Sequence, residues 1–501
     1  MTARWSRRAT LLGGLSGLGA LTGLTGLTGC GGETPSAARS SSATLTTPSS
    51  TSAARRVPWG RLARHVPLVQ PTSPSYGQLR LTPNPRWDGA KPLAIARCAT
   101  AAQVATTLAF ARAHGVPIAL RAGGHSYPGW SAGANRLVVD VRPMTGVSWS
   151  GTALTVGAGL TLAPIVSALA AHGRAVPTGS CPTVGVTGLT QGGGVGVLTR
   201  AYGLTCDHLR SAEVVLASGQ RVTASADAHP DLFWALRGGG GGHLGVVTSL
   251  TFTTVAAPTL VTTYLTWPAA RAGDVIPAWF AWIGGADARA WSTLKLLGGA
   301  AHPSGMSVAA TVTWVGPPAG FDAMLAPILA TSPSGRYDHT RSYLAAMQAY
   351  AGSGAREAFA ATSHVAYAAP GTAASTIVAH ASAVPGALRE AGISIDALGG
   401  HVGSLAPTDT AFVHREALAT VQYTGTWDAA APHAGQAAGI AQSYVSSFRT
   451  AMTPSWGEHA YVNYADASLT DPGTAYFGAN WPRLQQVRAT YDPDGLFTQP
   501  Q

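Results

Sequence analysis

Two nucleophilic side chains lie inside glycine-rich segments of the chain. His125 stands in the segment RAGGHSY, residues 121–127, and Cys181 opens a glycine-rich run that ends at Gly196. Imidazole and thiolate are the strongest nucleophiles that a protein offers near neutral pH. Backbone N–H groups beside glycine can approach an anionic pyrophosphate closely, because no Cβ stands in the way. The two segments therefore predict a dinucleotide site, although a lone histidine or cysteine is more often a structural residue.

A third glycine-rich segment, residues 238–242, favours a dinucleotide over plain turns. Gly240 also begins a literal match to the Rossmann fingerprint GxGxxG. The match follows a predicted helix over residues 231–237 and precedes a predicted strand from Val246 to Thr251. Because the fingerprint must follow a strand and open a helix, we exclude a Rossmann site here.

The elements that position these segments alternate between helix and strand. Thr100 and Gln103 suggest a capping box for a helix that stops at Gly115, and a strand over residues 116–120 then leads into the His125 segment. Residues 181–196 are too glycine-rich for a helix or a regular strand and are predicted as loop. The other predicted elements in this half are strands at 137–141 and 154–156, a helix at 162–172 and a hairpin of 213–216 with 221–223.

The length of 501 residues and the 46% of hydrophobic residues predict two packed domains. The fold class is α+β. We expect an export signal over residues 1–30, a flexible linker rich in Ser, Thr and Pro over 31–56, a first domain over 57–255, a substrate domain over 256–455, and a final segment, 456–501, that returns to the first domain. Strands such as 307–315 alternate with alanine-rich helices in the substrate domain.

The N-terminus resembles a twin-arginine export signal that ends in a lipobox. Arg7 and Arg8 precede a mild apolar stretch, and Leu27-Thr-Gly-Cys30 closes it. This resemblance implies an extracytoplasmic protein that a lipid on Cys30 anchors at the surface of a bacterium. A membrane-spanning helix is the alternative, but the stretch is short and diluted with Gly and Thr.

Charge and cysteine content exclude other classes. The formal net charge is +10, but the arginines are scattered singly, so we predict no nucleic-acid partner. No cysteine pair has C-x-x-C spacing, and we predict no metal site. Three cysteines remain beside Cys30, an odd number that leaves one thiol unpaired, and we expect Cys98 and Cys206 to be core thiols.

Residues from about 85 to 256 and from 459 to 501 resemble the berberine-bridge-enzyme-like FAD-linked oxidases. The resemblance rests on the His125 and Cys181 segments, on FWALR at 233–237, on FVHR at 412–415 and on YVNYAD at 461–466. It implies a PCMH-type FAD-binding domain and an α/β substrate domain with an antiparallel sheet backed by helices. It also implies FAD held covalently, through His125 to the flavin 8α-methyl group and through Cys181 to flavin C6.

The resemblance implies a larger set of cofactor-binding residues around these two anchors. They are Arg121, Gly123, Gly124, Ser126, Tyr127, Val184, Gly185, Gly188, Leu189, Gly194, Gly196, Val246 and Asn480. The chain departs from the family pattern at Thr187-Gly-Leu189, where Gly-Gly-His is usual, and at His243, where Asn is common.

The resemblance leaves two tyrosines as candidates for the catalytic base. The family's catalytic glutamate would fall at Gln422, in a strand that we predict from Phe412 to Trp427, and glutamine is no base. The base is then a tyrosine, and period-two alternation would place Tyr461 and Tyr464 on opposite faces of a strand. We favour Tyr461 over Tyr464, and expect Gln422 to bind the substrate or the flavin.

The resemblance predicts an oxidase for an alcohol or lactol carbon of a saccharide or a hydroxylated natural product. Val184 stands where the family has a gatekeeper for oxygen, and its small side chain favours oxygen as the acceptor, with release of hydrogen peroxide. A dehydrogenase of the same fold with another acceptor is the first alternative. A lipid-tethered solute-binding protein without catalysis is the second.

Overall fold

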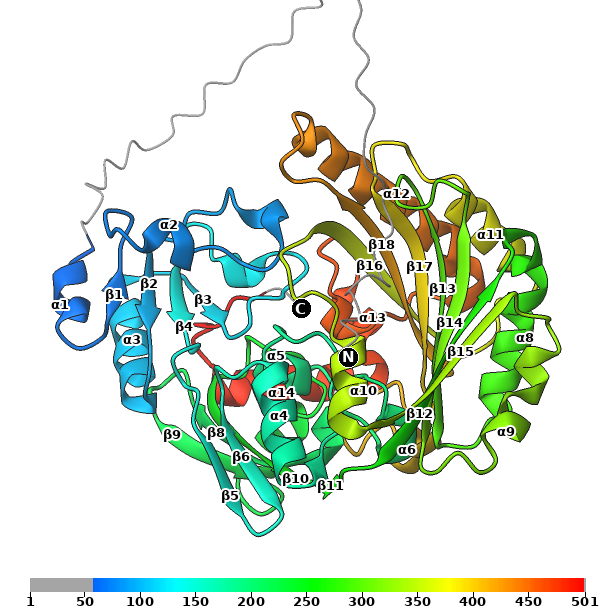
Figure 1. Cartoon of the computed structure of the whole chain (residues 1–501). Coiled ribbons are helices and arrows are strands. Elements are labelled where there is room, and N and C mark those ends of the chain that lie inside the picture. Colours follow the sequence, from blue (N-terminus) through cyan, green and yellow to red (C-terminus); the bar gives the residue numbers. More distant parts are fainter. Residues whose placement is uncertain (1–56, 500–501) are drawn as a thin grey trace, which may run out of the picture. The chain divides into compact units, whose positions relative to one another are not determined.

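The computed structural model describes residues 57–499 (Figure 1). The predicted export signal, Cys30 and the linker lie outside these residues. Three larger sheets and one two-stranded sheet carry the strands of the described chain. They belong to a unit that begins at Gly60, so the domain boundary at residue 255 stays a prediction.

The first sheet is small and leads into the His125 segment. Its strand order is β1 Leu68–Val69, β2 Ala94–Arg97, β4 Leu137–Asp140 and β3 Ile118–Arg121. Strands β2, β4 and β3 are parallel, and helix α3, Ala101–His114, connects β2 to β3. Thr100 Oγ1 accepts a hydrogen bond from Gln103 N–H at 3.2 Å, and Gly115 ends the helix with φ 62°. The predicted helix and the strand after it are confirmed.

The second sheet is antiparallel and has β10 at its centre. Its order is β5 Val147–Ser150, β6 Ala153–Gly157, β10 Val246–Thr253, β8 Leu209–Val215 and β9 Arg221–Ser225. Strands β8 and β9 form the predicted hairpin. Because strand β10 follows Gly245, the rejection of a Rossmann site is confirmed. A separate pair joins β7, Arg174–Ala175, to β11, Val255–Ala256.

The third sheet is antiparallel and supplies one wall of the candidate site. Its order is β15 Gly335–Ser342, β12 Thr259–Trp267, β14 Ser307–Val315, β13 Ala290–Gly298, β17 Glu390–Ala397, β18 Ala419–Trp427 and β16 Ala358–Ala366. The helices that back it, on the right in Figure 1, are α8 Ala272–Gly285, α9 Phe321–Leu329, α11 Ala374–Ser382 and α12 Ala434–Trp456. The predicted antiparallel sheet backed by helices is confirmed.

The two faces of this sheet are distinguished by their contacts. On one face, Tyr423 of β18 packs on Phe448 of α12 with ring centroids 4.8 Å apart, and Trp279 of α8 donates to Ser292 Oγ of β13 at 2.9 Å. Successive side chains of a strand point to opposite faces, so Gln422 must lie on the face without these helices. We call that face the site face.

The remaining helices are short and surround the sheets. They are α1 Trp59–Ala63, α2 Tyr76–Leu79, α4 Leu162–Ala171, α5 Val186–Gln191, α6 Thr199–Tyr202, α7 Pro230–Ala235, α10 Tyr343–Tyr350, α13 Pro472–Phe477 and α14 Trp481–Tyr491. No helix within residues 57–499 is both long and apolar enough to cross a membrane. Within the same residues, no group of three His, Cys, Asp or Glu side chains is placed to hold a metal ion.

Three local predictions are wrong. Residues 186–191 form helix α5 although we predicted loop throughout 181–196, because only Gly188 interrupts that turn. The predicted strand over 412–427 begins only at Ala419. Residues 462–464 form a 3₁₀ turn in place of a strand, and Tyr464 N–H donates to Tyr461 O at 2.8 Å.

Candidate active site

The segments that carry His125 and Cys181 are held together by two glycines. A Cβ added to Gly123 would lie 2.2 Å from the backbone N of Gly185, and one added to Gly185 would lie 2.4 Å from the N of Gly123. The backbone of the other segment occupies the space of each missing side chain, and a contact of these segments with a pyrophosphate stays a prediction. Only glycine permits so close an approach at both positions. The contact fixes the two nucleophile-bearing segments side by side.

The two predicted anchors share one hydroxyl group. Thr183 Oγ1 lies 2.9 Å from His125 Nε2 and 3.7 Å from Cys181 Sγ. Cys181 is exposed and is not in a disulfide. Burial lowers the pKa of His125 to about 4, so its ring is neutral at pH 7. Sequence reasoning missed Thr183, although its place two residues after Cys181 was a signal.

Arg121 supports the His125 segment from within the protein. Its guanidinium donates to the backbone oxygens of Leu79 at 2.8 Å, Ser131 at 2.7 Å and Ala132 at 3.1 Å. The residue is 2% exposed, and burial lowers its pKa to about 10, which leaves it charged at pH 7. These hydrogen bonds give Arg121 a structural role in the segment, and its contact with the cofactor stays a prediction.

The rest of this segment is held by a left-handed glycine and by hydrogen bonds to two tryptophans outside it. Gly124 has φ 79°, a conformation that favours glycine. Ser126 Oγ accepts from Trp130 N–H at 3.2 Å, and the backbone oxygen of Tyr127 accepts from Trp87 Nε1 at 2.9 Å. These two bonds fix the backbone that follows His125.

The residues after Cys181 differ in exposure. Val184 and Leu189 are half-buried, and Gly188 is exposed with open space where a Cβ would stand. Val184 N–H donates to Cys181 O at 3.3 Å, and Leu189 O accepts from Asn463 Nδ2 at 2.9 Å. The side chains of Val184 and Leu189 are therefore partly accessible.

Four further predicted cofactor residues lie in packed backbone, and their contact with a cofactor stays a prediction. Gly194 N–H donates to Tyr461 Oη at 2.9 Å, and Gly196 N–H donates to Thr199 Oγ1 at 2.8 Å. Val246 of β10 pairs with Val215 of β8, and Asn480 Nδ2 donates to Pro407 O at 2.7 Å.

Gln422 joins the site face of the third sheet to the His125 segment. Its Nε2 donates a hydrogen bond to Tyr127 Oη. The Tyr127 ring is stacked parallel to the Tyr464 ring, with centroids 5.8 Å apart and an angle of 3° between the planes. Gln422, Tyr127 and Tyr464 thus form one group, as predicted for a shared site but through contacts that no sequence pattern revealed.

The two candidate bases occupy different environments. Tyr461 is 2% exposed, and its hydroxyl oxygen accepts from Gly194 N–H and Asn463 Nδ2, both at 2.9 Å. Tyr464 is only half-buried. Because a 3₁₀ turn repeats every three residues, the two rings lie on the same side, with centroids 5.0 Å apart, and not on opposite faces as predicted.

Asp396 is the functional candidate that sequence reasoning missed. Tyr464 Oη donates to Asp396 Oδ2 at 3.2 Å. Asp396 lies on β17, and its register partner on β18 is Thr420, which shares the site face with Gln422. Burial raises the pKa of the Asp396 carboxyl. A lone carboxylate in the apolar alternation GISID, residues 392–396, was the available signal.

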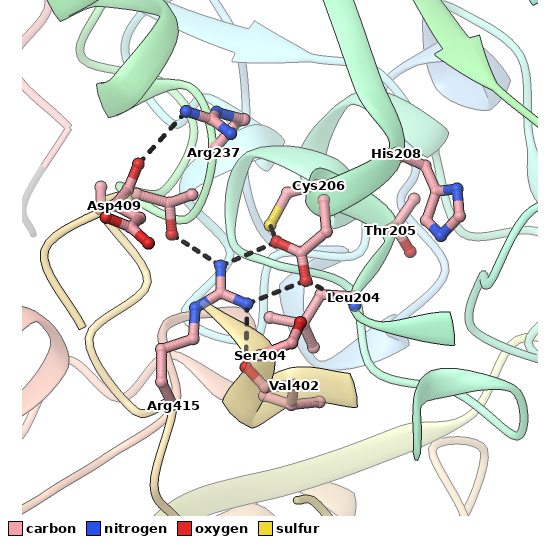
Figure 2. Close-up of polar contacts among 12 residues, drawn as sticks. Leu204, Thr205, Cys206, His208, Arg237, Val402, Ser404, Asp409 and Arg415 are labelled. Atoms are coloured by element: carbon pink, nitrogen blue, oxygen red, sulfur yellow. Dashed lines mark hydrogen bonds and ion pairs between the residues drawn. The ribbon is translucent and has the colours of Figure 1, made fainter. Parts of the chain in front are cut away.

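A buried ion pair ties the motif FVHR to the core beside the site (Figure 2). Arg415 Nη1 lies 2.8 Å from Asp207 Oδ2, and Nη2 lies 2.7 Å from Oδ1. The Arg415 side chain is fully buried, and the pair fixes the segment that places the Phe412 ring 6.1 Å from the Tyr461 ring. Asp207 also accepts from Leu204 N–H at 2.9 Å.

A buried donor beside the third glycine segment tests whether FAD fits. Gln191 is 4% exposed, and within residues 57–499 its Nε2 has no hydrogen-bond partner. Its backbone oxygen accepts from Gly238 N–H at 3.0 Å and from Gly240 N–H at 2.9 Å. Buried donors in folded proteins are almost always satisfied, and the oxygens of FAD would supply an acceptor here. The described residues therefore fit the cofactor.

Comparison with known proteins agrees with this geometry. Residues 92–225 match the family model of the FAD binding domain, and residues 460–501 match that of berberine and berberine-like proteins. The chain is 31% identical over 442 residues to the FAD-linked oxidoreductase YgaK of Bacillus subtilis. The aligned residues are 86% of this chain and 95% of YgaK.

Two saccharide oxidases are also similar. The chitooligosaccharide oxidase of Gibberella zeae is 30% identical over 456 residues, which are 82% of this chain and 87% of that one. The structure of the glucooligosaccharide oxidase of Acremonium strictum, described with a 6-S-cysteinyl, 8α-N1-histidyl FAD, superposes with a TM-score of 0.77 at 25% identity, over 87% of this chain and 96% of that one.

The structure brings the glycine-rich segments together at one site. The relatives and the two family models indicate the same kind of site, one for FAD. This chain belongs to the berberine-bridge-enzyme-like FAD-linked oxidoreductases.

Proposed function

We propose that the chain is an FAD-dependent oxidase for an alcohol or lactol carbon of a saccharide, with oxygen as the electron acceptor and hydrogen peroxide as a product. The contact of Tyr464 Oη with Asp396 Oδ2, on the site face beside Gln422, carries the proposal. The names of the similar saccharide oxidases support the substrate class.

Tyr464 is the residue that we propose as the base, in place of Tyr461. The hydroxyl of the half-buried Tyr464 can take the proton of a substrate hydroxyl while the Asp396 carboxylate accepts the tyrosine's own proton. Tyr461 is too deeply buried to contact a substrate. Gln422 holds Tyr127 and leaves its carbonyl oxygen to orient a substrate hydroxyl. Bound FAD supplies the hydride acceptor for the carbinol carbon.

We also propose that FAD is attached to both His125 and Cys181. His125 Nε2 is engaged by Thr183, which leaves Nδ1 as the ring nitrogen without a partner within residues 57–499. The low pKa of His125 keeps the ring a neutral nucleophile, and Cys181 is an accessible thiol. The bicovalent FAD of the similar glucooligosaccharide oxidase supports this assignment.

The attachment has a direct test. The denatured wild-type chain should keep its flavin, whereas His125→Ala and Cys181→Ala should each keep it through the remaining bond, and the double variant should release it. Thr161→Ala, outside both segments, is the control. Intact mass then reports one FAD per chain, and loss of all flavin from the denatured wild-type chain would refute the proposal.

The choice of oxygen rests on Val184. Its side chain is small and half-buried next to Cys181, which favours access of oxygen to the site. We expect Val184→Leu to slow reoxidation of the reduced enzyme in air, with reduction by substrate unchanged, when both half-reactions are followed by stopped-flow absorbance. Reoxidation of the wild type by a quinone but not by air would favour the dehydrogenase alternative. The non-catalytic alternative is not retained, because the chain belongs to an oxidoreductase family.

Export and lipid anchoring remain our proposal from the N-terminal segment alone. Arg7, Arg8 and Cys30 support it. The intact mass of the chain isolated from membranes of its host should correspond to a lipidated N-terminus at Cys30.

A further inference from the structure

Two exposed tyrosines stand next to each other on the third sheet. Tyr264 of β12 is 43% exposed and Tyr337 of β15 is 61% exposed. They are direct register partners in the antiparallel pair of β12 with β15. Directly opposite residues of an antiparallel pair point to the same face, so the two rings form a single platform.

Strand register places this platform on the site face. The row of partners runs from Asp396 through Thr293 and Thr311 to Tyr264 and Tyr337. Each step keeps the side chains on one face. The platform therefore lies on the face that carries Asp396 and Gln422, opposite the packed helices.

The distance along this row is several times the width of one sugar. Tyr264 is three strands from Asp396 and Tyr337 is four, which corresponds to about 14 and about 19 Å at the usual strand spacing. A monosaccharide that is oxidised beside Tyr464 cannot reach Tyr337. A ligand that touches both must be an extended chain.

The neighbouring row of site-face side chains, which contains Thr262 and Thr313, is covered by other parts of the protein. One position along β12 on the same face, Thr262 accepts from Arg341 Nη1, and on β14 Thr313 is 2.7 Å from Tyr350 Oη of helix α10. That row is thus occupied by protein side chains. In the next row, by contrast, Tyr264 and Tyr337 remain exposed, with Lys295 exposed one row further on.

We propose that Tyr264 and Tyr337 form a distal subsite that stacks on a sugar ring of an oligosaccharide whose reacting end lies beside Tyr464. The flat, weakly polar face of a pyranose packs on an aromatic ring, and two adjacent tyrosines offer such a surface at little entropic cost. This inference rests on the proposed function and specifies its substrate class as a chain of at least three sugars.

The test uses the holoenzyme and a length series of β-1,4-linked glucose oligomers, from cellobiose to cellopentaose. For the wild type we expect KM to fall between cellobiose and cellotetraose. Tyr264→Ala and Tyr337→Ala should raise the KM for cellotetraose by about tenfold, the equivalent of one lost ring contact. The KM for cellobiose and kcat should not change.

Matched variants separate stacking from damage to the sheet. Tyr264→Phe and Tyr337→Phe should behave as the wild type, because the ring is kept. Thr340→Ala changes an exposed residue on the opposite face of the same strand and should have no effect. Equal KM changes for both oligomers, or none, would overturn the subsite while the oxidase proposal stands.

A binding measurement keeps the subsite testable if no sugar is oxidised, a result that would instead refute the proposed function. Titration calorimetry with cellotetraose should then show binding to the wild type that Tyr337→Ala weakens about tenfold. Absence of binding to the wild type would overturn the subsite as well.

Discussion

Replacing Tyr464 by phenylalanine is expected to lower kcat by about 10²–10⁴-fold, because proton transfer by a positioned base contributes about that much. The variant keeps the ring that stacks on Tyr127 and loses only the hydroxyl that contacts Asp396. Flavin content and the circular dichroism spectrum should be unchanged. The rate is measured as peroxide release under saturating saccharide.

Tyr461→Phe is the matched control, with the opposite signature. It removes the oxygen that accepts from Gly194 N–H and Asn463 Nδ2, and leaves two donors without that acceptor in a buried place. We expect a loss of about 1–3 kcal/mol in unfolding free energy and a kcat within a few-fold of the wild type. A large loss of kcat in Tyr461→Phe, with Tyr464→Phe active, would return the role of base to Tyr461.

Asp396 gives the same prediction a pH dependence. Burial raises the pKa of its carboxyl, so the carboxylate that accepts the proton of Tyr464 is lost as pH falls through that raised pKa. kcat/KM should therefore fall on the acid side of the profile, at a pH above the range of an ordinary aspartate. Asp396→Asn should lower kcat and abolish this acid limb, whereas an unchanged limb would exclude Asp396 as its origin.

Breaking the ion pair of Asp207 with Arg415 is expected to have the largest effect on stability. Asp207→Asn leaves the fully buried guanidinium of Arg415 without its carboxylate and should cost about 3–5 kcal/mol in unfolding free energy. The measurement is chemical unfolding followed by tryptophan fluorescence. The cost arises from an unpaired buried charge, so the double variant Asp207→Leu with Arg415→Met should recover part of it.

An exposed pair supplies the control for this experiment. Arg271 and Asp274 are 3.3 Å apart, with side chains 44% and 65% exposed. Asp274→Asn should change the unfolding free energy by at most about 1 kcal/mol, because water screens exposed ion pairs. If Asp207→Asn proves equally mild, the pair does not hold the segment around Phe412.

The elements that sequence predicted correctly are those whose signals are local. Thr100 and Gly115 delimit helix α3 because a cap and a left-handed glycine act on their own turn. The strand over 307–315 matches β14 residue for residue. The segments of His125 and Cys181 were also recognised locally, because each matches a distinctive part of the family pattern, and the bonds of these two residues to FAD stay a prediction.

The choice between the two tyrosines was decided by tertiary structure. Alternation over residues 461–464 suggested a strand, but the backbone turns as a 3₁₀ helix and brings both rings to one side. Asp396, which distinguishes Tyr464, lies on another element and reaches it only through the register of the third sheet. The sequence of residues 461–464 alone shows neither what packs around this turn nor that Asp396 lies beside it.

The glycines show the same division between local and tertiary information. Sequence alone established that Gly123 and Gly185 lie in segments where backbone must approach something closely, and that His125 and Cys181 stand beside them. Only the folded chain showed that each approaches the other, with the Cβ positions blocked by backbone. A glycine in the sequence indicates that a side chain does not fit at that position. Which atoms fill the space depends on the distant segments that folding brings together.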